Sequence, residues 1–284
     1  MFKKIFFVTA LLLASLLSAK PVVIASIAPV GYLAKAVGGD KIEVQSLAKG
    51  DVHSYEPKPN DMKAVAKASL FIAAGLEFEE AWIPRFKASA KNLVVVQSDA
   101  KIAKLKEERG EQAEHDEKHE AHADPHVWLN PMLAITMARN ISDALIDIDK
   151  ANKDFYLENF QKLMNDLLAF DESAKNELAG LKNRKFVVYH PAWGYFAAHY
   201  DLEQISIERS GKEPKIDEMA STLKMIKDEN IKVIFADPNR SQKSAQVLAS
   251  QTGAKVELLD PLGYNLLENL KIAVGAIKDA NSPK

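Results

Sequence analysis

The sequence predicts an α/β protein of two lobes, each built on a parallel sheet, with one long helix joining them. Short β-branched runs alternate with helical patterns in two separate blocks, and the segment between the blocks has an amphipathic helical pattern. Strand–helix alternation is typical of parallel sheets covered by helices on both faces. The length of 284 residues is enough for about two domains of this kind.

Each block contains four short apolar runs bounded by Gly, Pro, Asp or Asn, which we expect to be strands. In the first block these runs are 21–27, 42–47, 70–75 and 93–97, with helices expected near 28–38 and over 61–68. In the second block they are 185–190, 204–208, 231–236 and 255–259, with helices expected near 191–200, 216–229 and 241–252. Each lobe is therefore predicted to be a (β/α)4 unit.

The segment between the blocks shows no strand pattern from Asn130 to Leu181, and its apolar residues recur at helical spacing. We expect one helix over 130–148 and a second over 153–180, the second about 40 Å long at a rise of about 1.5 Å per residue. Because a single stiff helix joins the lobes, little hinge motion is expected. The predicted domains are an N-terminal lobe (20–150), a linking backbone helix (151–181) and a C-terminal lobe (182–284).

The N-terminus has the pattern of a secretory signal peptide over residues 1–19. Lys3 and Lys4 precede the apolar run 5–17, and Ala19 is a small residue suited to cleavage. A membrane anchor is the alternative, but this run is short against the roughly 20 residues that a spanning helix needs. Export through a cleaved signal peptide is the favoured interpretation.

Composition narrows the class of protein further. A net charge of −2 gives no sign of the basic surface that nucleic-acid binding requires, so no nucleic-acid partner is expected. The chain contains no cysteine, which argues against disulfides and against a lipid anchor on cysteine. We expect a monomer that is soluble in a bacterial periplasm.

Four of the seven histidines lie close together, from His115 to His126. The acidic loop, residues 106–124, has no apolar side chain larger than alanine and is expected to be mobile, because it buries too little surface to offset its ordering entropy. Any metal site formed by His115, His119 and His122 is therefore expected to be weak and auxiliary. The alternative is that the acidic loop is only a solvated linker.

Metal-binding residue types also follow predicted strands in both lobes. His53 lies in the loop after the second strand, His190 closes the fifth and Asp260 follows the eighth, while His126 precedes the first connecting helix. Because ligands gather at the carboxyl ends of parallel strands, three imidazoles and one carboxylate are expected to meet in the cleft between the lobes. Asp237, after the seventh strand, is an equally well placed carboxylate, and any one histidine alone is more often structural.

Four motifs carry a resemblance to a known family: "GDVHSYEPKPND", "ADPHVWLNP", "YHPAWGYFAAHYDL" and "LLDPLG", in this order. Together they resemble the metal-binding family of ABC-transporter solute-binding proteins, particularly its periplasmic zinc branch, the ZnuA type. The likeness extends from about Val22 to Ala280. It implies two (β/α)4 lobes joined by a long backbone helix, with a metal cleft between the lobes.

The resemblance also implies a ligand set and a partner. The ligands would be His53, His126, His190 and Asp260, and the partner would be a membrane permease driven by a cytoplasmic ATPase. Some zinc relatives have an acidic residue just before the first histidine; Val52 stands there in this chain, which favours Asp260 or a water as the fourth ligand.

Zn²⁺ is the expected cargo, because it prefers tetrahedral, nitrogen-rich sites, whereas manganese and magnesium prefer more oxygen ligands. Manganese-transporting relatives have a carboxylate where this chain has His190. Cu²⁺ would bind the same atoms tightly. Since neutral imidazole is the ligand form, protons are expected to compete with the metal below about pH 6.5.

The alternatives are a solute-binding protein for manganese or another divalent metal, a periplasmic zinc hydrolase and an adhesin. A hydrolase is disfavoured because the sequence has no H-E-x-x-H motif, and Glu56, three residues after His53, lies on a proline-flanked loop. An adhesin is disfavoured because no aromatic stripe or repeat is evident. We therefore expect a protein that is not an enzyme.

Overall fold

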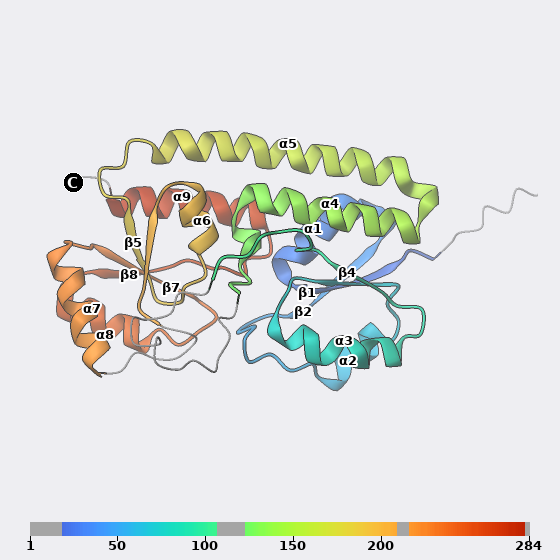
Figure 1. The fold of residues 1–284 in the computed structure, drawn as a ribbon, viewed down its shortest axis with the longest axis horizontal. Helices are drawn as coiled ribbons and strands as arrows, with labels where there is room; N and C mark the ends of the chain where they lie inside the picture. Colours follow the sequence, from blue (N-terminus) through green and yellow to red (C-terminus); the bar gives the residue numbers. More distant parts are fainter. Residues whose placement is uncertain (1–18, 107–122, 209–215, 282–284) are drawn as a thin grey trace, which may run out of the picture.

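The computed structural model describes residues 19–106, 123–208 and 216–281. It confirms two α/β lobes placed side by side and joined by a long helix that runs over both (Figure 1). The predicted signal peptide and the loop histidines His115, His119 and His122 lie outside the described residues.

The first lobe contains a parallel sheet with strand order β2-β1-β3-β4. Its strands are β1 (Val22–Ile27), β2 (Glu43–Ala48), β3 (Leu70–Ala73) and β4 (Val94–Gln97). Its helices are α1 (Ala28–Gly38), the short η1 (Gly39–Lys41), α2 (Pro59–Val65) and α3 (Glu77–Ser89). All four predicted strands are confirmed.

Helix α3 was not among the predicted elements, because its apolar positions are few and Pro84 lies inside it. Its first turn is held by Glu79, whose buried carboxylate accepts hydrogen bonds from the backbone N–H groups of Ala74, Gly75 and Leu76. A side chain that satisfies the free N–H groups of a helix start stabilises a helix of weak periodicity.

The second lobe repeats this arrangement with strand order β6-β5-β7-β8, again all parallel. Its strands are β5 (Lys185–Val188), β6 (Glu203–Ser206), β7 (Val233–Ala236) and β8 (Lys255–Leu258). Its helices are α6 (Gly194–His199), α7 (Ile216–Asp228), α8 (Lys243–Thr252) and α9 (Leu266–Asn281). Helix α9 is a further element that the sequence analysis did not predict.

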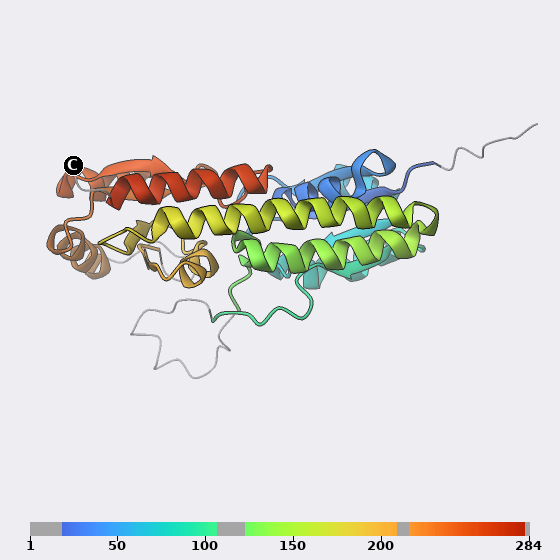
Figure 2. The ribbon, with the colours of Figure 1, turned by 90° about the horizontal axis from the view of Figure 1, so that it is seen from above.

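The connecting region contains η3 (Val127–Leu129), α4 (Pro131–Ile148), η4 (Lys150–Asn152) and α5 (Lys153–Leu178). Seen from above, α5 lies between α4 and α9 and reaches from one lobe to the other (Figure 2). The predicted amphipathic pattern is confirmed, although Leu168, which is apolar and at helical spacing, is 40% exposed. The buried apolar residues of α5 are Tyr156, Phe160, Leu163, Leu167, Phe170, Ala174 and Leu178. This face belongs to one hydrophobic cluster that includes Ile72 of the first sheet and Phe235 of the second.

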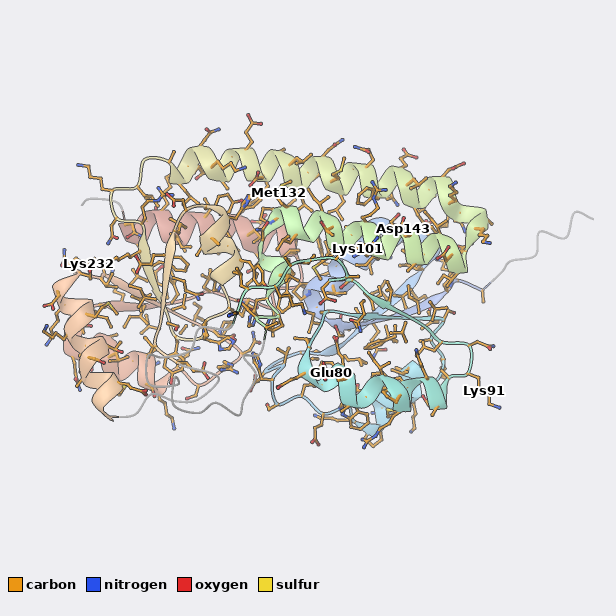
Figure 3. All side chains as sticks on the ribbon, in the orientation of Figure 1. Glu80, Lys91, Lys101, Met132, Asp143 and Lys232 are labelled. Carbon is orange, nitrogen blue, oxygen red and sulfur yellow. The ribbon has the colours of Figure 1, made fainter. Side chains whose placement is uncertain are left out.

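Two smaller clusters cover the opposite faces of the sheets. One contains Phe71 of β3 and Phe86 of α3, and the other contains Ile234 of β7 and Leu248 of α8. Charged side chains such as Lys91 and Lys232 lie on the outside at opposite ends of the molecule (Figure 3). Within the described part of the chain, no helix is both long enough and apolar enough to span a bilayer.

The core role of α5 predicts unequal effects at two neighbouring positions. Leu167 is fully buried, so Leu167→Ala is expected to lower the free energy of unfolding by about 2–5 kcal/mol in urea denaturation. Leu168 is 40% exposed, and the matched change Leu168→Ala is expected to stay within about 0.5 kcal/mol of the unmodified protein. Equal losses at both positions would contradict the assigned face.

Candidate metal centre

His53 lies in the loop after β2, held by a short turn around Asp51. The two carboxylate oxygens of Asp51 accept from the His53 backbone N–H at 3.2 Å and from the Ser54 hydroxyl at 3.0 Å. A carboxylate that accepts from the backbone two residues on is a common turn device and fixes the loop. The His53 Nε2 atom is buried and has no hydrogen-bond partner among the described residues. A bound ligand is one way in which a buried ring nitrogen of this kind is satisfied.

His126 is positioned by the residues on both sides of it. Asp124 Oδ1 accepts from its backbone N–H at 2.9 Å and from its Nδ1 at 2.7 Å. The ring packs against buried Trp128, with centroids 5.2 Å apart. After Trp128, the Asn130 side chain caps the N-terminus of α4, and Pro131 is the first residue of this helix. With Nδ1–H donated to the carboxylate, the Nε2 lone pair of His126 remains available for a metal.

His190 is positioned by the strand register of the second sheet. β5 and β6 pair with Val188 opposite Ser206, so His190 and Glu208, each two residues further on, lie side by side. His190 Nδ1 is 2.9 Å from Glu208 Oε2 and 3.2 Å from Arg240 Nη1. Because an ionised carboxylate only accepts, the shorter contact to Glu208 assigns the proton to His190 Nδ1. Arg240 Nη1, which only donates, makes its shorter contacts to the Glu208 oxygens, at 2.7 Å. The Nε2 lone pair of His190 is therefore also available.

The three histidines come together at the junction of the lobes. Their ring centroids are 5.1 Å (His53–His190), 5.3 Å (His126–His190) and 5.7 Å (His53–His126) apart. One nitrogen of each lies within 4.8 Å of the others. A tetrahedral zinc ion with Zn–N bonds of about 2.0–2.1 Å holds its nitrogens about 3.3 Å apart, so the three rings would move closer together on binding.

Neither expected carboxylate belongs to this group of three. Asp260 Oδ1 accepts from Asn239 Nδ2 at 2.9 Å and from the Leu262 backbone N–H at 2.8 Å. Asp237 Oδ1 accepts from the backbone and side-chain N–H groups of Asn239, at 2.7 and 3.0 Å. Asn239 thus ties the two candidate carboxylates to each other beside the histidine cluster.

Burial keeps two of the imidazoles neutral. It lowers the pKa of His190 to about 4, and nearby His126 and Arg240 act in the same direction, while Glu208 partly opposes them. The pKa of His53 is also lowered, first by burial and then by His126 and Arg240. Burial alone would raise the pKa of Glu208, but its contacts with His190 and Arg240 lower it overall and keep it ionised. Proton competition at these two histidines therefore sets in below the pH of about 6.5 expected for free imidazole.

Asp51, Asp124, Glu208 and Arg240 are site residues that the sequence analysis did not identify. Asp124 was readable in principle, because an aspartate two residues before a candidate histidine ligand is well placed to accept from its ring. Asp51, two residues before His53, was readable in the same way as an acceptor for the His53 backbone N–H. Glu208 and Arg240 were not, because their partners lie 18 to 189 residues away along the chain. His199, the remaining histidine of the described residues, lies apart from the cluster and contacts Asp171 of α5 at 2.6 Å.

Two parallel α/β lobes joined by a long helix, with imidazoles gathered at their junction, define the class of two-lobed metal-binding solute-binding proteins. Comparison with protein families gives a match over residues 23–280 to the family described as "ZnuA: Zinc-uptake complex component A periplasmic". The chain belongs to this family, which confirms the resemblance seen in the four sequence motifs.

Individual relatives agree with this assignment. The chain is 30% identical over 279 residues to the high-affinity zinc uptake system protein ZnuA of Bacillus subtilis, covering 91% of this chain and 86% of the relative. A crystal structure of ZnuA has a TM-score of 0.87 at 34% identity, covering 93% of this chain and 100% of that one. A ZnuA deletion mutant with zinc bound has a TM-score of 0.86 at 34% identity, covering 94% and 100%.

The low pKa of His190 predicts its titration in the metal-free protein. Its ring signal in NMR spectra is expected to move with a midpoint near pH 4, because the buried ring resists protonation. His199→Gln removes the His199 signal without touching the cluster, which shows that the signal followed does not come from His199. A midpoint for His190 at or above the ordinary value of about 6.5 would contradict the described environment.

Proposed function

We propose that this protein captures Zn²⁺ outside the cytoplasm and delivers it to the membrane permease of an ABC transporter. The observation that carries the proposal is the meeting of His53, His126 and His190 from two lobes, with two of the rings fixed by carboxylates. Membership of the zinc-uptake family and the zinc named for its relatives support it.

The donor set favours zinc over harder cations. Three neutral nitrogens suit a tetrahedral zinc site, whereas manganese and magnesium would require more oxygen ligands. The Nδ1 protons of His126 and His190 are donated to Asp124 and Glu208, which orients each ring and raises the basicity of its Nε2. Such support is expected to strengthen zinc binding.

Asp260 is our proposed fourth ligand, with Asp237 or a water as the alternatives. Among the described residues, both hydrogen bonds that its carboxylate accepts reach Oδ1, so Oδ2 is the atom suited to a metal. A fourth protein ligand would close the coordination sphere, whereas a catalytic zinc keeps an open position for water. We therefore propose a binding protein rather than an enzyme.

The remaining parts of the proposal concern cellular context. The signal-peptide pattern at 1–19 supports delivery to the periplasm, and the absence of cysteine supports a form without a lipid anchor on that residue. The protein is proposed to act as a monomer that presents its loaded cleft to the permease. His115, His119 and His122 are proposed to offer a weak auxiliary site for metal.

Competition titration tests the site and its metal. The purified protein is expected to bind one tight Zn²⁺ per chain and to lose affinity at least about 100-fold in His53→Ala, His126→Ala and His190→Ala, since even outer-shell changes cost 10–100-fold. Zinc is expected to displace manganese from the unmodified protein.

Control variants distinguish residues that bind the metal from residues that do not. His199→Gln, a histidine change outside the cluster, is expected to leave zinc affinity unchanged. Asp260→Asn is expected to weaken it, and unchanged affinity in this variant would assign the fourth position to a water or to Asp237. Manganese displacing zinc would refute the proposed cargo.

Shortening the acidic loop tests the auxiliary role of its histidines. Lys106 and Ala123 form an antiparallel bridge, so a two-residue Asn-Gly turn is a suitable replacement for residues 107–122. This variant is expected to keep one tight zinc per chain and to lose any weaker zinc seen by calorimetry. Loss of the tight zinc would overturn the assignment of His126, rather than the loop histidines, to the main site.

A further inference from the structure

Arg240, which follows β7 in the second lobe, contacts acidic residues of both lobes. Its Nη1 lies 2.7 Å from each carboxylate oxygen of Glu208, within the same lobe. Its Nη2 lies 2.8 Å from Asp51 Oδ1, in the loop of the first lobe that carries His53. The arginine side chain is only 14% exposed, so solvent weakens these charge-assisted contacts less than it would at the surface.

These contacts complete a chain of hydrogen bonds between two of the clustered histidines. The His53 backbone N–H donates to Asp51 Oδ1, and Arg240 donates to that same oxygen. Arg240 also donates to Glu208, which accepts from Nδ1 of His190. The backbone of His53 in one lobe is thereby linked to the ring of His190 in the other through a single guanidinium.

We propose that Arg240 is a positioning residue that ties the His53 loop to His190 across the cleft and so slows the release of the bound metal. The inference rests on the proposed zinc-binding function and assigns to it a residue that would not itself touch the ion. With the link intact, the first-lobe ligand leaves the ion only when the contact between Asp51 and Arg240 also breaks. Without it, the His53 loop moves away independently.

A simple electrostatic role would have a different consequence. Arg240 carries positive charge close to the cluster, so its removal should strengthen cation binding by charge alone. Removal of the negative charge of Asp51 should weaken cation binding by charge alone. A positioning role instead predicts that both changes speed metal release, because each breaks the same cross-lobe contact.

The opposite charges of the two partners allow a direct experiment. Zn²⁺ dissociation from the loaded, full-length protein is followed by stopped-flow mixing with an excess of a chromogenic chelator. Arg240→Gln and Asp51→Asn are each expected to raise the dissociation rate by about tenfold, and the double variant by little more than either, because contacting residues act non-additively. Arg240→Lys, which keeps the charge but lacks the planar fork, is expected to fall between them and the unmodified protein.

A second ion pair of the same lobe provides matched controls. Lys185 Nζ lies 2.8 Å from Glu229 Oε1 at the amino end of β5, the opposite end from His190. Lys185→Gln and Glu229→Gln make the same two charge changes far from the cluster, and the dissociation rate is expected to stay within twofold. Thermal unfolding by circular dichroism confirms that each variant is folded before its rate is compared.

The outcomes separate this inference from the proposed function. Failure of the unmodified protein to bind zinc would refute the function itself. Tight zinc binding with opposite rate changes in Arg240→Gln and Asp51→Asn would show that charge alone acts, and the positioning role would be wrong. Unchanged rates in both variants, or equal changes in the Lys185 and Glu229 controls, would also overturn it.

Discussion

The shared hydrophobic core along α5 is the constraint on which the rest of the structure depends. The buried face of this helix packs in one continuous cluster with residues of both sheets, so the lobes are not separate bodies on a flexible tether. That packing holds the two sheets side by side, with His53 and His190 beyond the ends of β2 and β5 at one junction. The histidine cluster depends on this fixed relation, since its members come from both lobes.

At that junction, carboxylates orient two of the imidazole rings, and burial sets the protonation state of two. Asp124 and Glu208 fix the Nδ1 atoms of their histidines, while burial keeps His190 and His53 neutral. These effects act together, because a neutral ring with one nitrogen already bonded presents its other lone pair in a defined direction. The arrangement of the three histidines is therefore compatible with cation binding. Arg240 forms ion pairs with Asp51 of the first lobe and with Glu208 of the second, and so connects the two lobes at this junction.

The strands and the histidine positions were predictable because they depend on local pattern. β-branched runs and the turn residues that bound them indicate all eight strands, and the ends of parallel strands indicate where His53 and His190 lie. Helix α9 had a readable pattern in Leu266, Leu270 and Ala273, and α3 was implied by the crossover that joins the parallel neighbours β3 and β4. The pairing of half-buried His199 with Asp171 was not predictable from local pattern, because the two residues lie 28 positions apart.

Local sequence pattern was enough to predict the order of the eight strands, the two lobes, the histidines near strand ends and the family of the chain. The charges that surround those histidines depend on the three-dimensional fold. Glu208 reaches His190 through strand register, and Arg240 reaches Asp51 across 189 positions of the chain, so no local pattern encodes either contact. The physical reason is that periodicity reports which face of an element is buried, whereas hydrogen-bond partners and pKa values depend on what the fold brings opposite that face.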